Sequence, residues 1–450
     1  MKRDFYKNMY QIALPVTIQG LLQASLSLID QIMIGSLGNA SIAGVGLGAK
    51  FISLFTVTMT AIVTVAGILI AQYCGNKNEK GISDSFFANL YFSLLVAIIF
   101  AVLSLSIPKQ IMGLYSEDAE TIKESVIYLR IMTMGFLPQT LTLMLSALLR
   151  NLEAAKIPMI AGGVSVASNT VLNYLLIFGI GGIPAMGVAG AALATGISRI
   201  LELLIIFGLF LKVKKKKQIQ LKATFSYPKE FLKKIITVLA PILLCEFLWS
   251  LGENVYAVIY GRIGTESCAA MTLTYPLQTL AIGALSGVSA AAGVMIGNLL
   301  GEGSNGKAYE DSKSFIKVTI GIALGISLLI ALFGSFYVKL YQVEEGTRQM
   351  TVYILLAYAV VFPAKVINMV LGGGILRSGG KTKYIMVVDM IGTWVFGVPL
   401  GLLAAYVWKL PIYWVYLILS MEEYVRVILC VIIFKSKRWM VNMTEEKAKG

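Results

Sequence analysis

The first hydrophobic run of the chain reads, from residue 10 to residue 37, YQIALPVTIQGLLQASLSLIDQIMIGSL. An α-helix needs about 20 mostly apolar residues to cross the hydrocarbon core of a bilayer, and this run exceeds that length. It has no small-residue cleavage site at its end, so we expect a first transmembrane helix rather than a cleavable signal peptide. The run decides the fold class, because similar runs follow it along the whole chain.

The composition of the chain agrees with a membrane protein. The 450 residues are 57% hydrophobic and only 14% charged, whereas soluble domains carry about 25% charged residues. About twelve hydrophobic runs can be counted, centred near residues 23, 60, 98, 138, 169, 198, 247, 285, 326, 362, 395 and 422. We therefore predict an all-α integral membrane protein with about 12 transmembrane helices.

The positive charge of the chain is distributed unevenly. Net charge is +14, from 38 Lys and Arg against 24 Asp and Glu. If the N-terminus lies inside, roughly 27 cationic residues fall in loops on that side and roughly 8 in loops on the other, as expected for cytoplasmic and external loops. We predict a multi-pass protein of the cell inner membrane with both termini cytoplasmic, and no nucleic acid partner.

Several kinds of chemistry are excluded by residue usage. The chain has no His, and Cys74, Cys245, Cys268 and Cys430 are scattered without a CxxC spacing. Zinc motifs, His-based triads and a disulfide framework are therefore not indicated. We expect no enzymatic activity and no cofactor beyond a coupling ion, H⁺ or Na⁺, with Asp and Glu as the natural proton carriers.

An internal repeat divides the chain into two halves. Repeats of this kind are common in transporters, and an even number of spans in each half gives both copies the same orientation. The positions that match at an offset of 226 or 227 residues include Pro15 with Pro241, Gly75 with Gly301, and Leu148-Leu149-Arg150 with Ile375-Leu376-Arg377.

This repeat predicts three parts of the chain. Residues 1–211 form an N-lobe of six transmembrane helices, residues 212–234 form a basic cytoplasmic linker, and residues 235–450 form a C-lobe of six helices. A basic segment next to a membrane span is expected to lie near anionic lipid.

Ionisable residues inside spans cost at least about 2.5–3.5 kcal/mol each on insertion scales, so they should face a cavity or a partner. In the first span Asp30 is such a residue, able to take a proton or bind a cation. It could instead be a helix-end carboxylate solvated at the outer interface. Asn169 and Asn173, at i and i+4, share a helix face and could complete a polar cluster with Asp30 or simply bond between helices.

The second half offers a different combination. Glu246 and Glu253 are seven residues apart on one helix face with Trp249 between them, which suits an organic cation through charge and cation–π attraction. Either glutamate could instead pair with a neighbouring helix. Further charged residues in spans are expected to form ion pairs or to lie at interfaces rather than to bind substrate; they are Arg199 with Glu202, and Lys365, Asp389, Glu422, Glu423 and Arg426.

With these features the chain resembles the multidrug and toxic compound extrusion (MATE) transporters. The resemblance covers essentially the whole chain and implies two six-helix lobes around a central cavity that opens alternately to either side. It is carried by Leu14-Pro15-Val16 and Ser27 to Gly35, by Leu148 to Pro158, by Asn169 to Tyr174, and by Pro241 and Gly372 to Lys381.

The resemblance also implies a cation-coupling site. The family's first-span acid is matched by Asp30, which is the expected ligand if the ion is Na⁺. The polar residues that the family uses in the fifth and sixth spans are matched by Asn169, Asn173 and Thr195. Many members have a second acid where this chain has Asn173, so a proton mechanism that needs two acids is not expected.

The second half departs from the family pattern. In one branch of the family a glutamate stands where this chain has Trp249, and an aspartate stands where it has Val366, beside Lys365. Coupling through a pair of C-lobe carboxylates is therefore not expected. Glu246, Trp249 and Glu253 are assigned to substrate binding instead.

The function predicted is secondary active multidrug efflux, an antiport of small organic cations against H⁺ or Na⁺ by alternating access. The expected state is a monomer in contact with membrane lipid. A lipid-linked oligosaccharide flippase of the same superfamily is the alternative, although the spans carry few cations for a pyrophosphate. A membrane-embedded enzyme lacks His, DxD or paired catalytic motifs, and a channel lacks rings of pore-lining charge.

Overall fold

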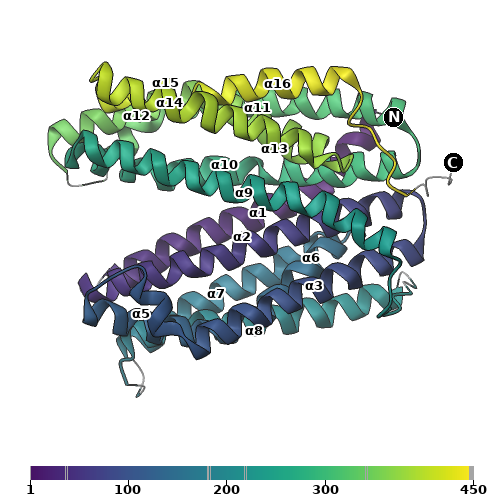
Figure 1. Ribbon diagram of the computed structural model, residues 1–450, viewed down its shortest axis with the longest axis horizontal. Helices are drawn as coiled ribbons and strands as arrows, with labels where there is room; N and C mark the ends of the chain where they lie inside the picture. The colour runs from purple at the N-terminus through teal and green to yellow at the C-terminus, as the bar shows by residue number, and fades with distance from the viewer. Residues whose placement is uncertain are drawn as a thin grey trace. The chain divides into compact units, whose positions relative to one another are not determined.

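The computed structural model is helical throughout, and no strand occurs within the part of the chain that it describes (Figure 1). Lys217, in the predicted linker, lies outside this part. The described residues are 2–35, 37, 39–179, 182, 184–216, 218, 220–339, 341 and 343–444.

The helices of the first half begin with two long ones, α1 and α2, each of more than 30 residues. The helices of this half are α1 (Lys2–Gly35), α2 (Asn39–Gly75), α3 (Glu79–Ser106), α4 (Pro108–Gly113), α5 (Ala119–Met132), η1 (Thr133–Gly135), α6 (Phe136–Asn151), α7 (Lys156–Phe178) and α8 (Gly187–Lys216).

The second half differs in containing three π-helical segments, η2, η3 and η4. Its helices are α9 (Lys229–Ile263), α10 (Thr265–Gly301), α11 (Asn305–Val338), α12 (Glu345–Ile367), η2 (Asn368–Leu376), α13 (Thr382–Met390), η3 (Ile391–Gly397), α14 (Val398–Leu402), η4 (Leu403–Val407), α15 (Ile412–Leu419) and α16 (Glu422–Ser436).

Contacts divide the chain into two compact units. We call one the N unit, which comprises Ile18–Ile70 and Lys77–Phe231. The other, the C unit, comprises Met1–Thr17, Ala71–Asn76 and Leu232–Gly450. Helices α1 and α2 therefore contribute to both units, since the start of α1 and the end of α2 pack with helices of the second half.

The predicted fold class is confirmed. Ten helical segments in the described part of the chain are long and apolar enough to cross a membrane. Two further predicted spans correspond to α1 and to the α15–α16 pair, in which Ser420 and Met421 separate two helices of 8 and 15 residues. The protein is thus an all-α, multi-pass membrane protein.

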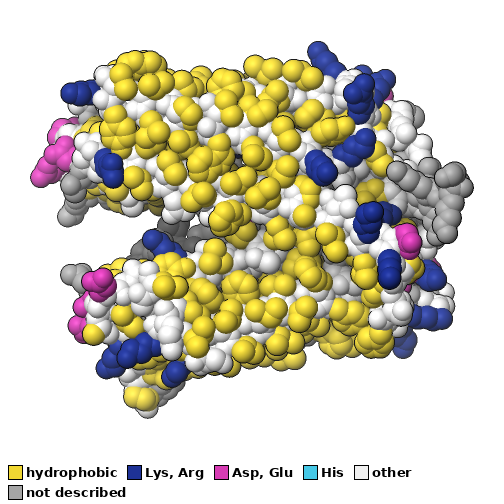
Figure 2. All heavy atoms as spheres, viewed as in Figure 1, with side chains coloured by type: hydrophobic (Ala, Val, Ile, Leu, Met, Phe, Trp, Pro, Cys, Tyr) yellow, Lys and Arg dark blue, Asp and Glu magenta, His cyan; other side chains and the backbone are white. Residues whose placement is uncertain are grey.

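The outer surface of each unit is apolar along the sides of its helices. In α11, Leu328 and Leu332 are 60% and 61% exposed, whereas Ala323 and Ile330 on the other face are buried. Small residues inside and large apolar residues outside are typical of helices that face lipid. Figure 2 shows hydrophobic side chains over the helix sides, with charged side chains mostly toward the helix ends.

Two repeat-related glycines form a close helix crossing inside the C unit, between the end of α2 and α10. A Cβ atom on Gly75 would collide with the backbone of Asn298, and one on Gly301 would collide with the backbone of Gln72. Gln72 and Asn298 are also 226 residues apart, so each residue contacts the repeat equivalent of its partner. Only glycine allows backbones this close.

Candidate coupling and substrate sites

A polar cluster in the N unit joins side chains from α1, α7 and α8. Asn173 Nδ2 donates to Asp30 Oδ1 at 2.6 Å and to Asn169 Oδ1 at 2.9 Å. Asn169 Nδ2 donates to Thr195 Oγ1 at 3.2 Å. Both asparagines are 1% exposed. The structure thus brings the four residues of the predicted coupling site into one hydrogen-bonded cluster.

The cluster offers several oxygen atoms to a cation. If the Asn169 amide is turned around, its nitrogen donates to Asp30 Oδ1 at 3.1 Å and its oxygen accepts from Thr195. Asn173 Oδ1 is buried without a hydrogen-bond partner. Hard cations prefer oxygen ligands, and a carboxylate can take a proton instead. A single carboxylate with neutral oxygens matches the charge of one monovalent cation.

Arg199 and Glu202 lie beside this cluster on α8. Arg199 Nη1 is 3.3 Å from Glu202 Oε2, and Glu202 is buried while the Arg199 side chain is 26% exposed. The predicted i, i+3 ion pair is therefore confirmed. Arg199 also interacts electrostatically with Asp30, so the cluster carries a compensating positive charge at its edge.

The three residues predicted to bind substrate, all on α9, have different surroundings in the C unit. Glu246 Oε1 lies 3.3 Å from Arg377 Nη1. Trp249 is 44% exposed. Glu253 is exposed and lines a pocket whose lining residues include neither of the other two. The structure therefore does not gather the three around a single pocket.

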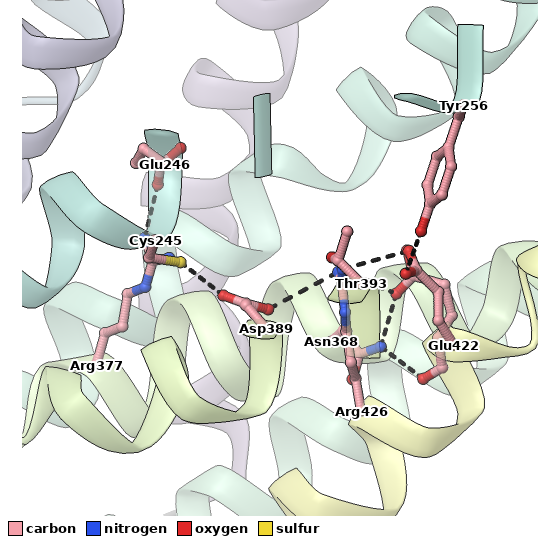
Figure 3. A network of polar contacts seen from close by, with 10 residues as sticks. Cys245, Glu246, Tyr256, Asn368, Arg377, Asp389, Thr393, Glu422 and Arg426 are labelled. Atoms are coloured by element: carbon pink, nitrogen blue, oxygen red, sulfur yellow. Dashed lines mark hydrogen bonds and ion pairs between the residues drawn. The ribbon is translucent and has the colours of Figure 1, made fainter. Parts of the chain in front are cut away.

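The Glu246–Arg377 pair is one end of a longer polar network in the C unit (Figure 3). Arg377 also donates to Cys245 Sγ at 3.7 Å, and the Cys245 thiol donates to Asp389 Oδ2 at 2.7 Å. Asp389 Oδ1 in turn lies 3.7 Å from Arg426 Nη1. The contacts thus run from α9 through α13 to α16.

Arg426 is the centre of the other end of this network. Its guanidinium lies 3.2 Å from Glu422 and 3.9 Å from Glu423, and all three side chains are 7% exposed. Tyr256 Oη donates to Glu422 Oε2 at 2.5 Å, and Asn368 Nδ2 donates to Glu423 Oε2 at 2.8 Å. Buried charges need such partners, because removal from water is costly.

Two π-helical segments position this network. Asn368 is the first residue of η2, and Thr393, which accepts from Arg426, lies in η3. Gly392 and Gly397 in η3 make room for it, since a Cβ atom at Gly392 would collide with Arg426 and one at Gly397 would collide with Tyr256 and Glu422. Wider π-helical turns are frequent at functional sites.

A pocket opens on the network from within the C unit. It has an empty volume of about 450 Å³, counting the solvent at its mouth. Its charged lining residues are Glu253, Lys365, Glu422 and Glu423. Aromatic rings beside carboxylates suit an organic cation. The rings are those of Tyr256, Tyr260, Tyr275 and Tyr416.

Sequence reasoning found the charged members of this network but not the neutral ones. Asp389, Glu422, Glu423 and Arg426 are ion-pair members, as predicted. One available signal was the i, i+4 spacing of Glu422 and Arg426. No local pattern predicts the partners Tyr256, Asn368 and Cys245, which the chain places 55 to 166 residues from the side chains they contact.

A family model described as MatE matches this chain over residues 15–175 and again over residues 241–403. The two matched segments begin at Pro15 and Pro241, the two prolines of the repeat.

Curated relatives match over most of their own length. An uncharacterized transporter, YisQ, of Bacillus subtilis is 24% identical over 443 residues, which cover 96% of this chain and 95% of the relative. A probable multidrug resistance protein, NorM, of Photorhabdus laumondii is 24% identical over 89% of this chain and 87% of its own.

Solved structures have the same fold. An outward-facing multidrug resistance MATE family transporter of the MOP superfamily superimposes with a TM-score of 0.87 at 21% identity, over 96% of each chain. At this identity the likeness establishes the two-lobe helical fold.

Proposed function

This chain belongs to the MATE family of transporters, and from that premise we propose that it is a secondary active multidrug efflux transporter. It exports small organic cations by antiport against H⁺ or Na⁺. The names of curated relatives that match most of the chain, among them probable multidrug resistance proteins, support this substrate class.

The observation that carries the proposal is the coupling cluster of the N unit. Asp30 is a carboxylate in a membrane span, bonded at 2.6 Å to the buried Asn173 amide. Asn169 and Thr195 extend the cluster, and Asn173 Oδ1 is a buried oxygen free to accept. Asp30 holds one H⁺ or one Na⁺, with the amide and hydroxyl oxygens as additional Na⁺ ligands.

The transport cycle uses two lobes that move against each other. The lobes are residues 1–211 and 235–450, joined by the linker 212–234. Occupancy of Asp30 changes which arrangement of the N-lobe is favoured, so a cation entering from outside is exchanged for drug leaving. One monovalent cation that enters down about 100 mV contributes about 2.3 kcal/mol, enough to concentrate substrate substantially.

Substrate binds in the C-lobe, on α9 and the pocket beside it. Glu253 supplies a carboxylate at the pocket, and the exposed ring of Trp249 supplies an aromatic face one turn away. Glu246 acts from within its ion pair with Arg377. Three carboxylates in the pocket lining favour a cation over the pyrophosphate of a lipid-linked oligosaccharide.

The proposed setting is the cell inner membrane, with both termini and the basic linker in the cytoplasm and the protein as a monomer. The excess of Lys and Arg in alternate loops supports this orientation.

Efflux of ethidium from energised everted vesicles tests the proposal. Wild type is compared with Asp30→Asn, with and without Na⁺ and with and without a protonophore. We expect transport by wild type that depends on one of the two ions and is lost in Asp30→Asn. Unchanged transport by the variant would place coupling elsewhere. If wild type moves no dye, translocation of a labelled lipid-linked oligosaccharide tests the flippase instead.

A further inference from the structure

Lys365 contributes the positive charge among the residues that line the C-unit pocket. It lies on α12, two residues after Pro363 and three before η2 begins. The carboxylates of Glu253, Glu422 and Glu423 line the same pocket. A Lys in a membrane span is costly, so its retention beside three acids calls for a physical role.

The buried carboxylates of the pocket already have other partners. Glu422 accepts from Tyr256 and pairs with Arg426, and Glu423 accepts from Asn368. Within the described residues, Lys365 forms no ion pair within 4.0 Å. Its charge acts through space, since it interacts electrostatically with Glu423, Glu253 and Glu422.

Glu253 is the carboxylate of the pocket with the greatest freedom. It is exposed, and no hydrogen bond or ion pair joins its side chain to another described residue. A ligand cation that enters the pocket therefore meets an available carboxylate at Glu253 and a resident ammonium at Lys365. The first attracts each positive charge of the ligand, and the second repels it.

We propose that Lys365 is a tethered cation that sets the charge selectivity of the pocket, so that the pocket accepts monovalent organic cations and disfavours divalent ones. The inference rests on the proposed function and specifies the substrate class of the C-lobe site. Repulsion by a fixed unit charge grows in proportion to the ligand's charge, so a dication is disfavoured by twice the free energy of a monocation in the same position.

The repeat makes Lys365 a feature of the second half alone. At the offset of 226 residues, the first half has Gln139, which is neutral. The charge is therefore no requirement of the shared helix geometry. It can be removed or kept by substitution without altering the pattern of the repeat.

A matched pair of dyes tests the proposal. Ethidium and propidium share the same aromatic ring system, but ethidium carries one positive charge and propidium two. The affinity of each dye for the purified full-length protein in detergent is measured by fluorescence titration, for wild type, Lys365→Met and Lys365→Arg. Lys365→Gln provides a second variant without the charge, in case the Met variant folds poorly.

We expect Lys365→Met to bind ethidium about tenfold and propidium about a hundredfold more tightly than wild type, because the free-energy gain doubles with the ligand's charge. Lys365→Arg, which keeps the charge, should bind both dyes as wild type does. Glu253→Gln should change affinity in the opposite direction, and more for propidium.

Two results would overturn the role of Lys365 while leaving the exporter intact. One is unchanged or weaker binding of both dyes by Lys365→Met and Lys365→Gln, with wild-type ethidium efflux still present. The other is an equal gain for both dyes, which indicates a change of pocket shape rather than of charge. If wild type neither binds nor exports ethidium, both the exporter and this inference are refuted.

Discussion

The polar cluster of the N unit and the polar network of the C unit occupy corresponding halves of a repeated sequence, yet their chemistry differs. The N-unit cluster has one carboxylate, Asp30, bonded to neutral amides. In the C-unit network the Arg426 guanidinium alone lies within 4 Å of three carboxylates. A lone carboxylate among neutral oxygens changes its net charge when an ion binds. A compensated network holds its charges in place.

The difference shows that a repeat constrains the path of the helices more than the chemistry between them. Gly75 and Gly301 keep equivalent roles in both halves because the backbone approach leaves no room for a side chain. Asp30 and Arg426 have no such equivalents. The N unit is suited to respond to an ion, and the C unit is suited to hold a pocket in shape.

The largest expected effect separates the two regions by stability. Arg426→Met leaves buried carboxylates without their shared cation and should lower the free energy of unfolding by about 3–5 kcal/mol. Arg199→Met removes a partly exposed partner in the N unit and should cost about 0–1 kcal/mol. Thermal unfolding of the purified variants in detergent measures both. Equal shifts of the midpoint would remove the distinction between the regions.

The next effect concerns transport rather than stability. Asn173→Ala removes the donor to Asp30, a hydrogen bond to a charged group worth about 1.5–3 kcal/mol, and should reduce ion-coupled efflux at least about tenfold. Thr195→Val is the matched control, since Thr195 reaches Asp30 only through Asn169. Its efflux, measured in everted vesicles, should fall less than about threefold. A reversed order would move the coupling cluster away from Asn173.

A smaller effect tests how η3 shapes the C-unit network. Gly397→Ala places a methyl group where Tyr256 and Glu422 meet, and overpacking of this kind costs about 1–3 kcal/mol. Gly261→Ala, on the same unit, has open space around its Cβ position and should leave the unfolding midpoint unchanged or slightly raised. The comparison is weakened if Gly397→Ala unfolds at the wild-type temperature.

The smallest effect lies outside both regions, at the N-terminus of α5. The exposed Asp118 carboxylate accepts from Thr121 N at 2.8 Å, and this hydrogen bond holds the pKa of Asp118 below its usual value of 3.8. A lowered pKa stabilises the fold above pH 3.8, and the contribution is lost as pH falls through the folded-state pKa. Asp118→Ala should therefore reduce the unfolding temperature slightly at pH 7.

The size of this last difference should shrink in acid, and ethidium efflux should not change. A loss of efflux in Asp118→Ala would show that transport is sensitive to changes far from both the cluster and the network.

Much of the fold follows from the sequence because lipid makes hydropathy a local signal. Each backbone polar group must be satisfied within its own helix, so a run of apolar residues predicts a span without knowledge of its neighbours. The centres near residues 60, 169 and 285 lie within α2, α7 and α10. The π-helical segments η2, η3 and η4 were not predicted, since they depend on side chains packed from other helices.

The candidate sites were predicted unevenly for the same reason. Asn169 and Asn173 share a face through i, i+4 spacing, so their proximity is a local property. Glu246 appeared equivalent to Glu253 on that face, but Arg377, which lies 131 residues further along the chain, pairs with Glu246 alone. Helical spacing cannot show which of two acids a distant cation will reach.

The sequence by itself determined the spans, the repeat and the set of ionisable residues that must be shielded from lipid. Only the tertiary structure decided which of them are compensated. Tyr256 and Glu422 are 166 residues apart and bonded, while Glu253, one turn before Tyr256, stays exposed. Hydropathy is a sum over neighbours in the chain, whereas the pairing of buried charges depends on how separate helices pack.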